Sequence, residues 1–351
     1  MASTTAGAAD RSLADRQIVF VVGPGRSGTS TVAGALARCG FEVPGRAIRG
    51  NRTNPSGFYE PRWVVDFHRE QLKRLKVGTI DASPRAIEIV TDAMSGSEAE
   101  ETLRTWLSER LEKQPRLVVK DPRSIWFLRV WTELARELDA STGFVTMLRH
   151  PAEVSASRQR YYHDAEVAPE RAEEIARIAG WVNGLLVAEL ISRSTPRAFV
   201  RYDDLLEDWR AAMRPVAASL GLDLNPPIDQ RPHPVDEFID PSLHRVVVGW
   251  PDDVPAQLRD VAEGVWKTLS RFAGAGATGT PAELISEADR LRSAYGQLFT
   301  DAQALTRSAT MRARLAARRR GYAKAQAEEV PPSVWATVRS RLRTVVPGRQ
   351  S

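Results

Sequence analysis

A glycine-rich turn near the start of the chain carries the residues best suited to chemistry. It follows a continuous apolar run from Ile18 to Val22 and precedes a helical pattern from Ser30 to Arg38. The backbone N–H groups of such a turn and of a helix N-terminus converge and attract an anion. The sequence therefore predicts an anion-binding loop. Its residues are Gly25, Arg26, Ser27, Gly28, Thr29 and Ser30.

The loop departs from the nucleotide-binding P-loop at one position. Gly23 and Gly28 have the spacing of G-x-x-x-x-G-K-[ST], and Ser30 supplies the final hydroxyl. Thr29, however, stands in place of the lysine that normally reaches the β- and γ-phosphates. This change argues against an enzyme driven by ATP or GTP. Arg26 lies inside the loop, where we expect it to bind a different anion.

A second pair of residues with the chemistry to bind a phosphate lies further along the chain. The apolar run Phe144–Leu148 ends at Arg149, and the helical pattern that follows, from Pro151 to Tyr161, carries Ser157. Arginine offers a planar pair of donors that matches a phosphate, and serine adds a hydroxyl donor from the next helix. Alone, an arginine at a strand end is more often the partner in a surface ion pair, but combined with the first loop it favours phosphate binding.

The two elements resemble those of the sulfotransferases that use 3′-phosphoadenosine-5′-phosphosulfate (PAPS). Residues 25–30 are similar to the family's 5′-phosphosulfate loop, in which many members have lysine in place of Arg26. Arg149 and Ser157 are similar to the 3′-phosphate element. The resemblance implies a sulfuryl transfer from PAPS to an acceptor hydroxyl without a metal ion. It also implies a loop that closes over the nucleotide, in which Arg245 is the candidate contact.

The resemblance also implies a general base, for which the chain offers three candidates. Glu60 ends the segment Asn54-Pro55-Ser56-Gly57-Phe58-Tyr59-Glu60, which resembles a segment of bacterial relatives, and it is the first choice. Asp121 follows a predicted strand and is the second. His68 lies on the helix after Glu60, where a half-buried position is expected. Lys120, Arg123 and His68 would then line the sulfonate or acceptor side.

The elements that must position these residues alternate between strands and helices. Short apolar runs predict strands at 18–22, 117–119, 144–148 and 198–200. Helical patterns cover 99–113, 125–138, 151–161 and 172–192, and Asp203 is expected to cap a helix after the last strand. This order predicts an α/β fold of the P-loop-NTPase type, with a mostly parallel sheet between two layers of helices.

The chain divides into three predicted parts. Residues 1–16 form a flexible leader, 17–272 the sulfotransferase-like domain and 281–351 a helical, basic C-terminal extension. Residues 302–351 hold eleven basic and two acidic residues, a net +9. Residues 1–301 therefore carry −4 of the total +5. A basic amphipathic helix at 333–346 is compatible with an anionic membrane surface.

Composition limits the class of protein and its location. The single cysteine, Cys39, excludes an internal disulfide framework and any cysteine-based metal site. An apolar secretory signal is not recognisable at the start, and the apolar runs are too short for a membrane span. We expect a cytoplasmic protein that is peripheral to the membrane if its tail binds there.

Two other functions compete with the sulfotransferase interpretation. A P-loop-like kinase would use the strand before Asp121 as its Walker B strand, but Thr29 in the lysine position opposes it. A non-catalytic protein would bind nucleotide or an envelope partner, mainly through its tail. Nucleic-acid binding is disfavoured because basic and aromatic residues are little interleaved. The acceptor is open between a glycan, a glycolipid and a small metabolite. Four tryptophans are expected in the core: Trp106, Trp126, Trp131 and Trp181.

Overall fold

A computed structural model describes residues 16–51, 54, 56–162, 171–240, 249–251, 254–274 and 280–328. The chain divides into two compact units, Met1–Leu298 and Phe299–Ser351. Three predicted features lie outside the described residues: nearly all of the leader, the contact at Arg245 and the amphipathic helix at 333–346.

Four parallel strands form the central sheet of the first unit, in the order β2-β1-β3-β4. Their bounds are β1 Gln17–Val22, β2 Arg116–Lys120, β3 Ser141–Leu148 and β4 Arg197–Arg201. In the register of the sheet, Val21 lies beside Lys120 and Val22 beside Thr146. The strands are apolar on both faces because helices cover both, so every predicted strand and the parallel sheet are confirmed.

Helices connect the strands and cover the sheet. Between β1 and β2 lie α2 Thr29–Ala37, α3 Arg62–Leu75, α4 Ala86–Met94 and α5 Glu98–Lys113. Between β2 and β4 lie η1 Pro122–Phe127, α6 Leu128–Glu137, α7 Pro151–Tyr162, α8 Arg171–Ile191 and η2 Ser192–Ser194. After β4 come α9 Tyr202–Glu207, α10 Trp209–Leu220, α11 Ala256–Ser270 and α12 Pro281–Glu328.

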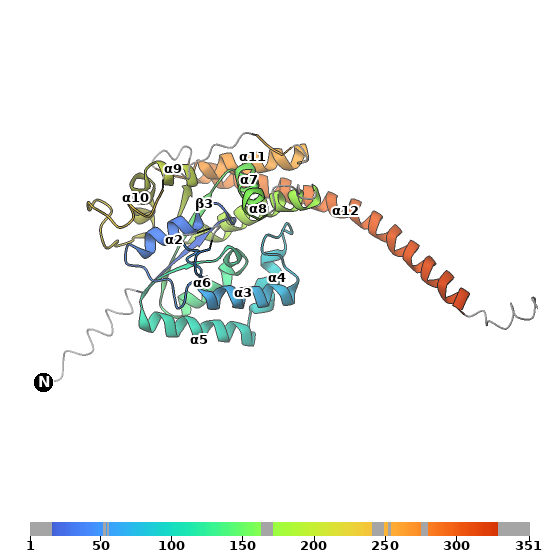
Figure 1. The fold of residues 1–351 in the computed structure, drawn as a ribbon, viewed down its shortest axis with the longest axis horizontal. Coiled ribbons are helices and arrows are strands. Elements are labelled where there is room, and N and C mark those ends of the chain that lie inside the picture. The colour runs from blue at the N-terminus through green and yellow to red at the C-terminus, as the bar shows by residue number, and fades with distance from the viewer. Residues whose placement is uncertain are drawn as a thin grey trace, which may run out of the picture. The chain divides into compact units, whose positions relative to one another are not determined.

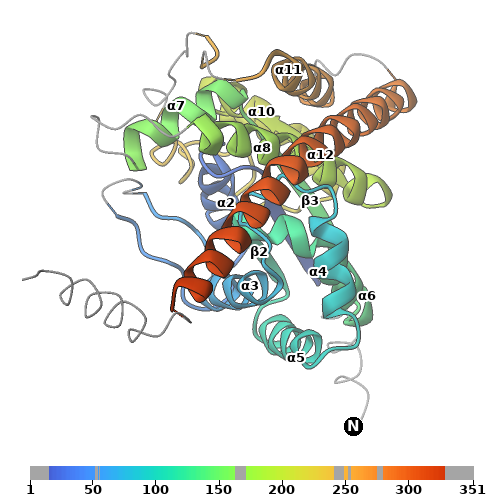
Figure 2. The same ribbon diagram turned by 90° about the vertical axis from the view of Figure 1, so that its right-hand side faces the viewer.

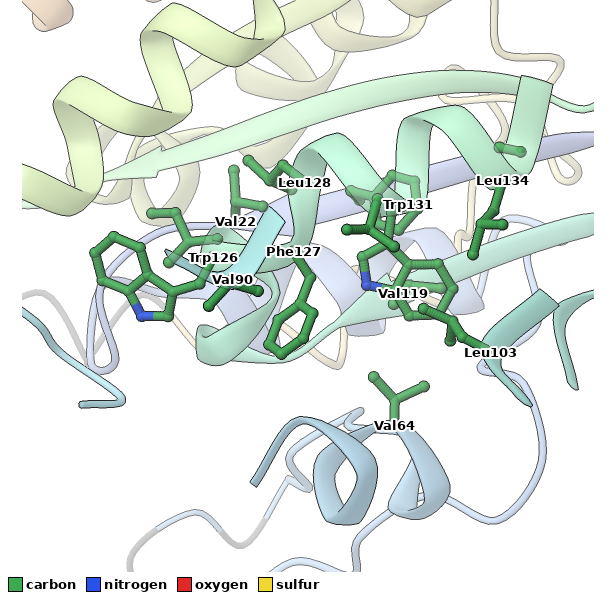
Figure 3. Close-up of a cluster of buried hydrophobic side chains, with 14 of the residues drawn as sticks. Val22, Val64, Val90, Leu103, Val119, Trp126, Phe127, Leu128, Trp131 and Leu134 are labelled. Atoms are coloured by element: carbon green, nitrogen blue, oxygen red, sulfur yellow. The ribbon is translucent and has the colours of Figure 1, made fainter. Parts of the chain in front are cut away.

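The two faces of the sheet belong to two apolar cores. Phe20 and alternate strand residues pack against α3, α4, α5, η1 and α6, whereas Val19 and Val21 pack against α2, α9 and α10. Figures 1 and 2 show α3 and α5 on one side of the sheet and α2 and α10 on the other. Trp126 and Trp131 project into the first core (Figure 3), and all four tryptophans expected in the core are buried. The three-layer α/β architecture is therefore confirmed.

Two local predictions were wrong. The helix expected at 125–138 is divided into the 3₁₀ turn η1 and the helix α6. Asp121 accepts a hydrogen bond from the Arg123 N–H, and the tight turn begins at Pro122, three residues earlier than predicted. Helix α9 has Arg201 at its N-cap, so Asp203 lies inside the first turn and does not cap the helix.

Two helices, α8 and α12, are longer than the other described helices. Helix α8 has the length and apolar composition of a membrane-spanning helix, but 67% of its most apolar window is buried inside the protein. Helix α12 begins at Pro281 as expected. The first compact unit ends at Leu298, and Leu284, Ala288 and Tyr295 of α12 are buried in it. The domain boundary at 272 stays a prediction.

The carboxyl ends of the four strands lie at one edge of the sheet because the strands are parallel. Gly23 follows β1, Asp121 follows β2, Arg149 follows β3 and Tyr202 follows β4. Open α/β sheets bind their ligands at this edge. The fold therefore places the predicted loops around one region.

Candidate active site

The loop after β1 has the backbone of an anion-binding turn. Gly23, Arg26 and Gly28 have φ angles of +141°, +76° and +84°. Gly28 is the N-cap of α2, where no side chain caps the helix and the first turn carries no acidic residue. A Cβ on Gly28 would lie 2.2 Å from the Tyr202 ring, so only glycine fits here. The positive end of the α2 dipole is thus directed into the loop without a protein anion in that first turn.

A buried hydroxyl in this loop lacks a protein partner. Ser27 is 0% exposed, and its Oγ makes no hydrogen bond to any residue that the structure describes. Leaving a buried polar group unpaired costs about 1–3 kcal/mol, so such a group usually has a functional reason. An anion held in the loop would accept the missing bond.

The second predicted element touches the first. The Nε of Arg26 donates to the Oγ of Ser157 at 3.2 Å, and the Nη1 of Arg149 donates to the carbonyl oxygen of Arg26 at 3.0 Å. Arg149 also pairs with Glu153 at 3.0 Å and lies over the Tyr202 ring, 4.7 Å from its centroid. These contacts orient the guanidinium, so the structure brings Arg26, Arg149 and Ser157 together although 131 residues separate the first from the last.

Lys120 joins Glu60 to the loop. Its Nζ lies 2.5 Å from the Oε1 of Glu60 and 3.3 Å from the Oγ of Ser30, and both Lys120 and Glu60 are largely buried. The Ser30 hydroxyl also donates to the carbonyl of Phe58, and the side-chain amide of Asn54 donates to Ser30 at 3.4 Å. The segment that contains Glu60 is therefore docked on the end of the anion-binding loop.

Tyr59, the residue before Glu60, has an unusual backbone conformation. Its φ of +54° is rare for a side chain of this size and marks backbone strain. The Tyr59 hydroxyl accepts a hydrogen bond from Arg38 at 2.9 Å, and its ring meets Phe238 edge to face at 5.6 Å. Sequence patterns did not identify these contacts of Tyr59, because Arg38 and Phe238 come from distant segments that only the fold brings together.

His68 and Asp121 form a sealed pair. His68 is 0% exposed and not half-buried as expected, because Phe127 stacks on its ring at 4.1 Å. Its Nδ1–H donates to Asp121 at 2.8 Å, and its Nε2 accepts from the Trp131 indole at 3.1 Å. Both ring nitrogens are therefore engaged, which removes His68 from the acceptor side where it was expected.

The charges of this pair follow from its surroundings. Burial lowers the pKa of His68 and outweighs the opposing effect of Asp121, so the imidazole is neutral. Burial acts to raise the pKa of Asp121, but hydrogen bonds from His68 and Arg123 together lower it. Asp121 also pairs with Arg123 at 2.7 Å. Both carboxylate oxygens of Asp121 are thus hydrogen-bonded to neighbouring side chains, and only 18% of the Arg123 side chain is exposed.

Comparison with known proteins gives solved structures of low similarity to this chain. No protein-family model and no curated protein matches the chain. Solved sulfotransferases are similar to it in structure. The sulfotransferase domain of the Synechococcus PCC 7002 olefin synthase has 16% identity and a TM-score of 0.38, with 80% of this chain and 94% of that chain covered.

Two further solved structures give similar values. Sulfotransferase STF1 from Mycobacterium tuberculosis H37Rv has 16% identity and a TM-score of 0.37, over 67% of this chain and 76% of that chain. The sulfotransferase domain of the curacin biosynthetic pathway has 14% identity and a TM-score of 0.33, over 79% and 96%. All three TM-scores lie below 0.5, so the function proposed below rests on the residues of this chain.

Proposed function

We propose that this chain is a PAPS-dependent sulfotransferase that acts on a hydroxyl group. The contact between Arg26 and Ser157 carries the proposal, because it joins the loop suited to a 5′-phosphosulfate to the element suited to a 3′-phosphate. A ligand with anionic groups at the 3′ and 5′ positions of its ribose would engage both elements at once. This requirement distinguishes PAPS from ordinary nucleoside triphosphates.

The residues of the site suit the donor. The loop from Gly25 to Ser30 would hold the 5′-phosphosulfate, with the unpartnered Ser27 hydroxyl as one donor. Arg149 and Ser157 would hold the 3′-phosphate, and Arg245 stays a candidate from the sequence. PAPS supplies the sulfuryl group: its sulfur–oxygen bond to the 5′-phosphate breaks as the acceptor oxygen bonds to sulfur, leaving 3′,5′-adenosine bisphosphate.

Glu60 is the proposed general base and accepts the proton of the acceptor hydroxyl. Its side chain is 12% exposed, whereas the side chain of Asp121 is fully enclosed by its partners. Lys120 pairs with Glu60 at 2.5 Å and adds positive charge at the end of the loop. Arg26 stabilises the negative charge that develops on the leaving phosphate, but an arginine does not readily donate a proton.

Lys120 also bears on the kinase alternative. In P-loop enzymes that use Mg²⁺, the hydroxyl in the position of Ser30 binds the metal ion. Here an ammonium group lies 3.3 Å from that hydroxyl, and the acid after β2, Asp121, is paired with His68 and Arg123. Like charges repel, so these residues suit metal-independent binding better than a Mg²⁺-nucleotide. The nature of the acceptor and the cytoplasmic location stay predictions.

Calorimetric titration with 3′,5′-adenosine bisphosphate tests the proposal. Metal-independent binding is expected in the wild type, with much weaker binding of 5′-AMP, which lacks the 3′-phosphate. Arg149→Ala is expected to lower the affinity for the bisphosphate toward that of 5′-AMP. A preference for Mg-ATP would favour the kinase, and bisphosphate binding without sulfuryl transfer to any hydroxyl acceptor would favour the non-catalytic protein.

A further inference from the structure

A cationic groove lies next to Glu60. It has a volume of about 580 Å³ and is lined by five residues, of which three are arginines and none is acidic. These residues are Arg46, Ala47, Ile48, Arg49 and Arg62. The groove is distinct from the anion-binding loop, since it shares no lining residue with it.

Backbone hydrogen bonds fix the groove to the proposed base. The N–H of Ile48 donates to the carbonyl of Glu60 at 2.8 Å, and the N–H of Arg62 donates to the carbonyl of Arg46 at 2.8 Å. Ala47 and Pro61 form an antiparallel bridge between these two bonds. One wall of the groove, residues 46–48, is therefore hydrogen-bonded to the backbone that carries Glu60.

The positive charge of the groove is only partly compensated. Arg62 pairs with Asp66 at 2.7 Å, but Asp66 also pairs with Arg69 at 3.0 Å, so one carboxylate serves two guanidinium groups. Arg46 and Arg49 are exposed, and neither forms an ion pair within the part of the chain that the structure describes. Because residues 1–301 carry a net charge of −4, this concentration of positive charge is local and not a consequence of composition.

We infer that the groove binds an anionic group on the acceptor, a sulfate, phosphate or carboxylate, while the acceptor hydroxyl meets Glu60. The inference rests on the proposed function for the identity of the reaction, but the anion site itself follows from the arginines. Planar guanidinium groups match such oxyanions and select them over neutral acceptors. The occupant is therefore an acceptor that already carries negative charge.

Calorimetry on the full chain tests this inference, with the donor site first saturated with 3′,5′-adenosine bisphosphate so that the loop takes no further anion. The probes are a chemically defined sulfated pentasaccharide and uncharged maltopentaose. We expect only the sulfated probe to bind, and R46A/R49A to weaken it by about tenfold, which corresponds to about 1.4 kcal/mol. The matched control R318A/R319A removes two exposed arginines of α12 and should change the affinity less than about twofold.

The outcomes separate the anion site from the proposed function. Equal binding of both probes, or a loss in R318A/R319A but not in R46A/R49A, would overturn the inference. If the bisphosphate does not bind but R46A/R49A still weakens the pentasaccharide, the groove stands and the sulfotransferase proposal fails. A second set of titrations uses phosphatidylglycerol vesicles. If R46A/R49A weakens binding to the vesicles but not to the pentasaccharide, the anionic group belongs to a lipid headgroup and not to a saccharide.

Discussion

Lys120 lies at the end of β2 with its Nζ 3.3 Å from the Oγ of Ser30, the hydroxyl that closes the anion-binding loop. The same ammonium is 2.5 Å from Glu60. One cation therefore links the proposed donor loop to the proposed base. This cation lies beside Ser30, and in P-loop enzymes of the kinase type the hydroxyl at the corresponding position binds a metal ion.

Binding of the bisphosphate is expected to be independent of Mg²⁺. Titrations in excess MgCl₂ and in EDTA should give dissociation constants within about twofold of each other. A larger difference would indicate that Mg²⁺ contributes to the free energy of binding. The physical reason is that Lys120 already supplies the positive charge at Ser30. A Mg²⁺ dependence of tenfold or more would contradict the role assigned to this lysine.

Glu60→Gln is expected to abolish turnover while sparing nucleotide binding. General-base catalysis is worth about 10²–10⁴-fold in rate, and the amide keeps the shape of the carboxylate but does not accept the proton. Steady-state sulfation of a hydroxyl acceptor and bisphosphate calorimetry measure the two effects separately. Glu70→Gln changes an exposed acid on α3 and serves as the control. Full activity in Glu60→Gln would move the base to another residue.

The stability of the fold is expected to decrease as the pH falls below about 6.5 because of His68. Burial lowers the pKa of His68 in the folded state, so the unfolded chain takes up its proton at a higher pH than the folded chain. The stabilisation is complete above pH 6.5, the pKa of His68 in the unfolded chain. It is lost as the pH falls toward the lower pKa of His68 in the folded chain.

Urea unfolding between pH 7 and pH 5 measures this effect. One such group contributes a slope of up to about 1.4 kcal/mol per pH unit. His68→Gln should be less stable at pH 7 but should lose most of the slope, whereas His150→Gln should retain it because His68 is still present. An unchanged slope in His68→Gln would show that other groups cause the pH dependence.

Gly28→Ala is expected to damage both the fold and the donor site. The new Cβ would meet the Tyr202 ring at 2.2 Å in a backbone conformation with φ +84°. We expect a loss of about 2–3 kcal/mol in the free energy of unfolding and no measurable bisphosphate binding. Gly296→Ala is the matched control, because nothing lies within 4 Å of its Cβ and alanine favours a helix by about 1 kcal/mol. Equal stability of the two variants would contradict the close packing described at Gly28.

The sequence by itself determined the four strands and the helices α2, α5, α7 and α8, and it predicted the two phosphate loops. Apolar runs and turn-forming glycines act over a few residues, so local patterns reveal the strands and the turn after Val22. They also place the start of the helix at Ser30, within one residue of the observed Thr29. The parallel sheet follows from the alternation of strands and helices. The core positions of Trp126 and Trp131 follow from helical spacing in the same way.

The tertiary structure decided which charged side chains act together. Lys120 meets Glu60 across 60 residues and Arg26 meets Ser157 across 131, because parallel strands bring their carboxyl ends to one edge of the sheet. The same packing encloses His68 under Phe127 and commits Asp121 to its neighbours. Burial and pairing of a titratable group depend on contacts between distant elements, and these contacts leave no periodic signal in the chain.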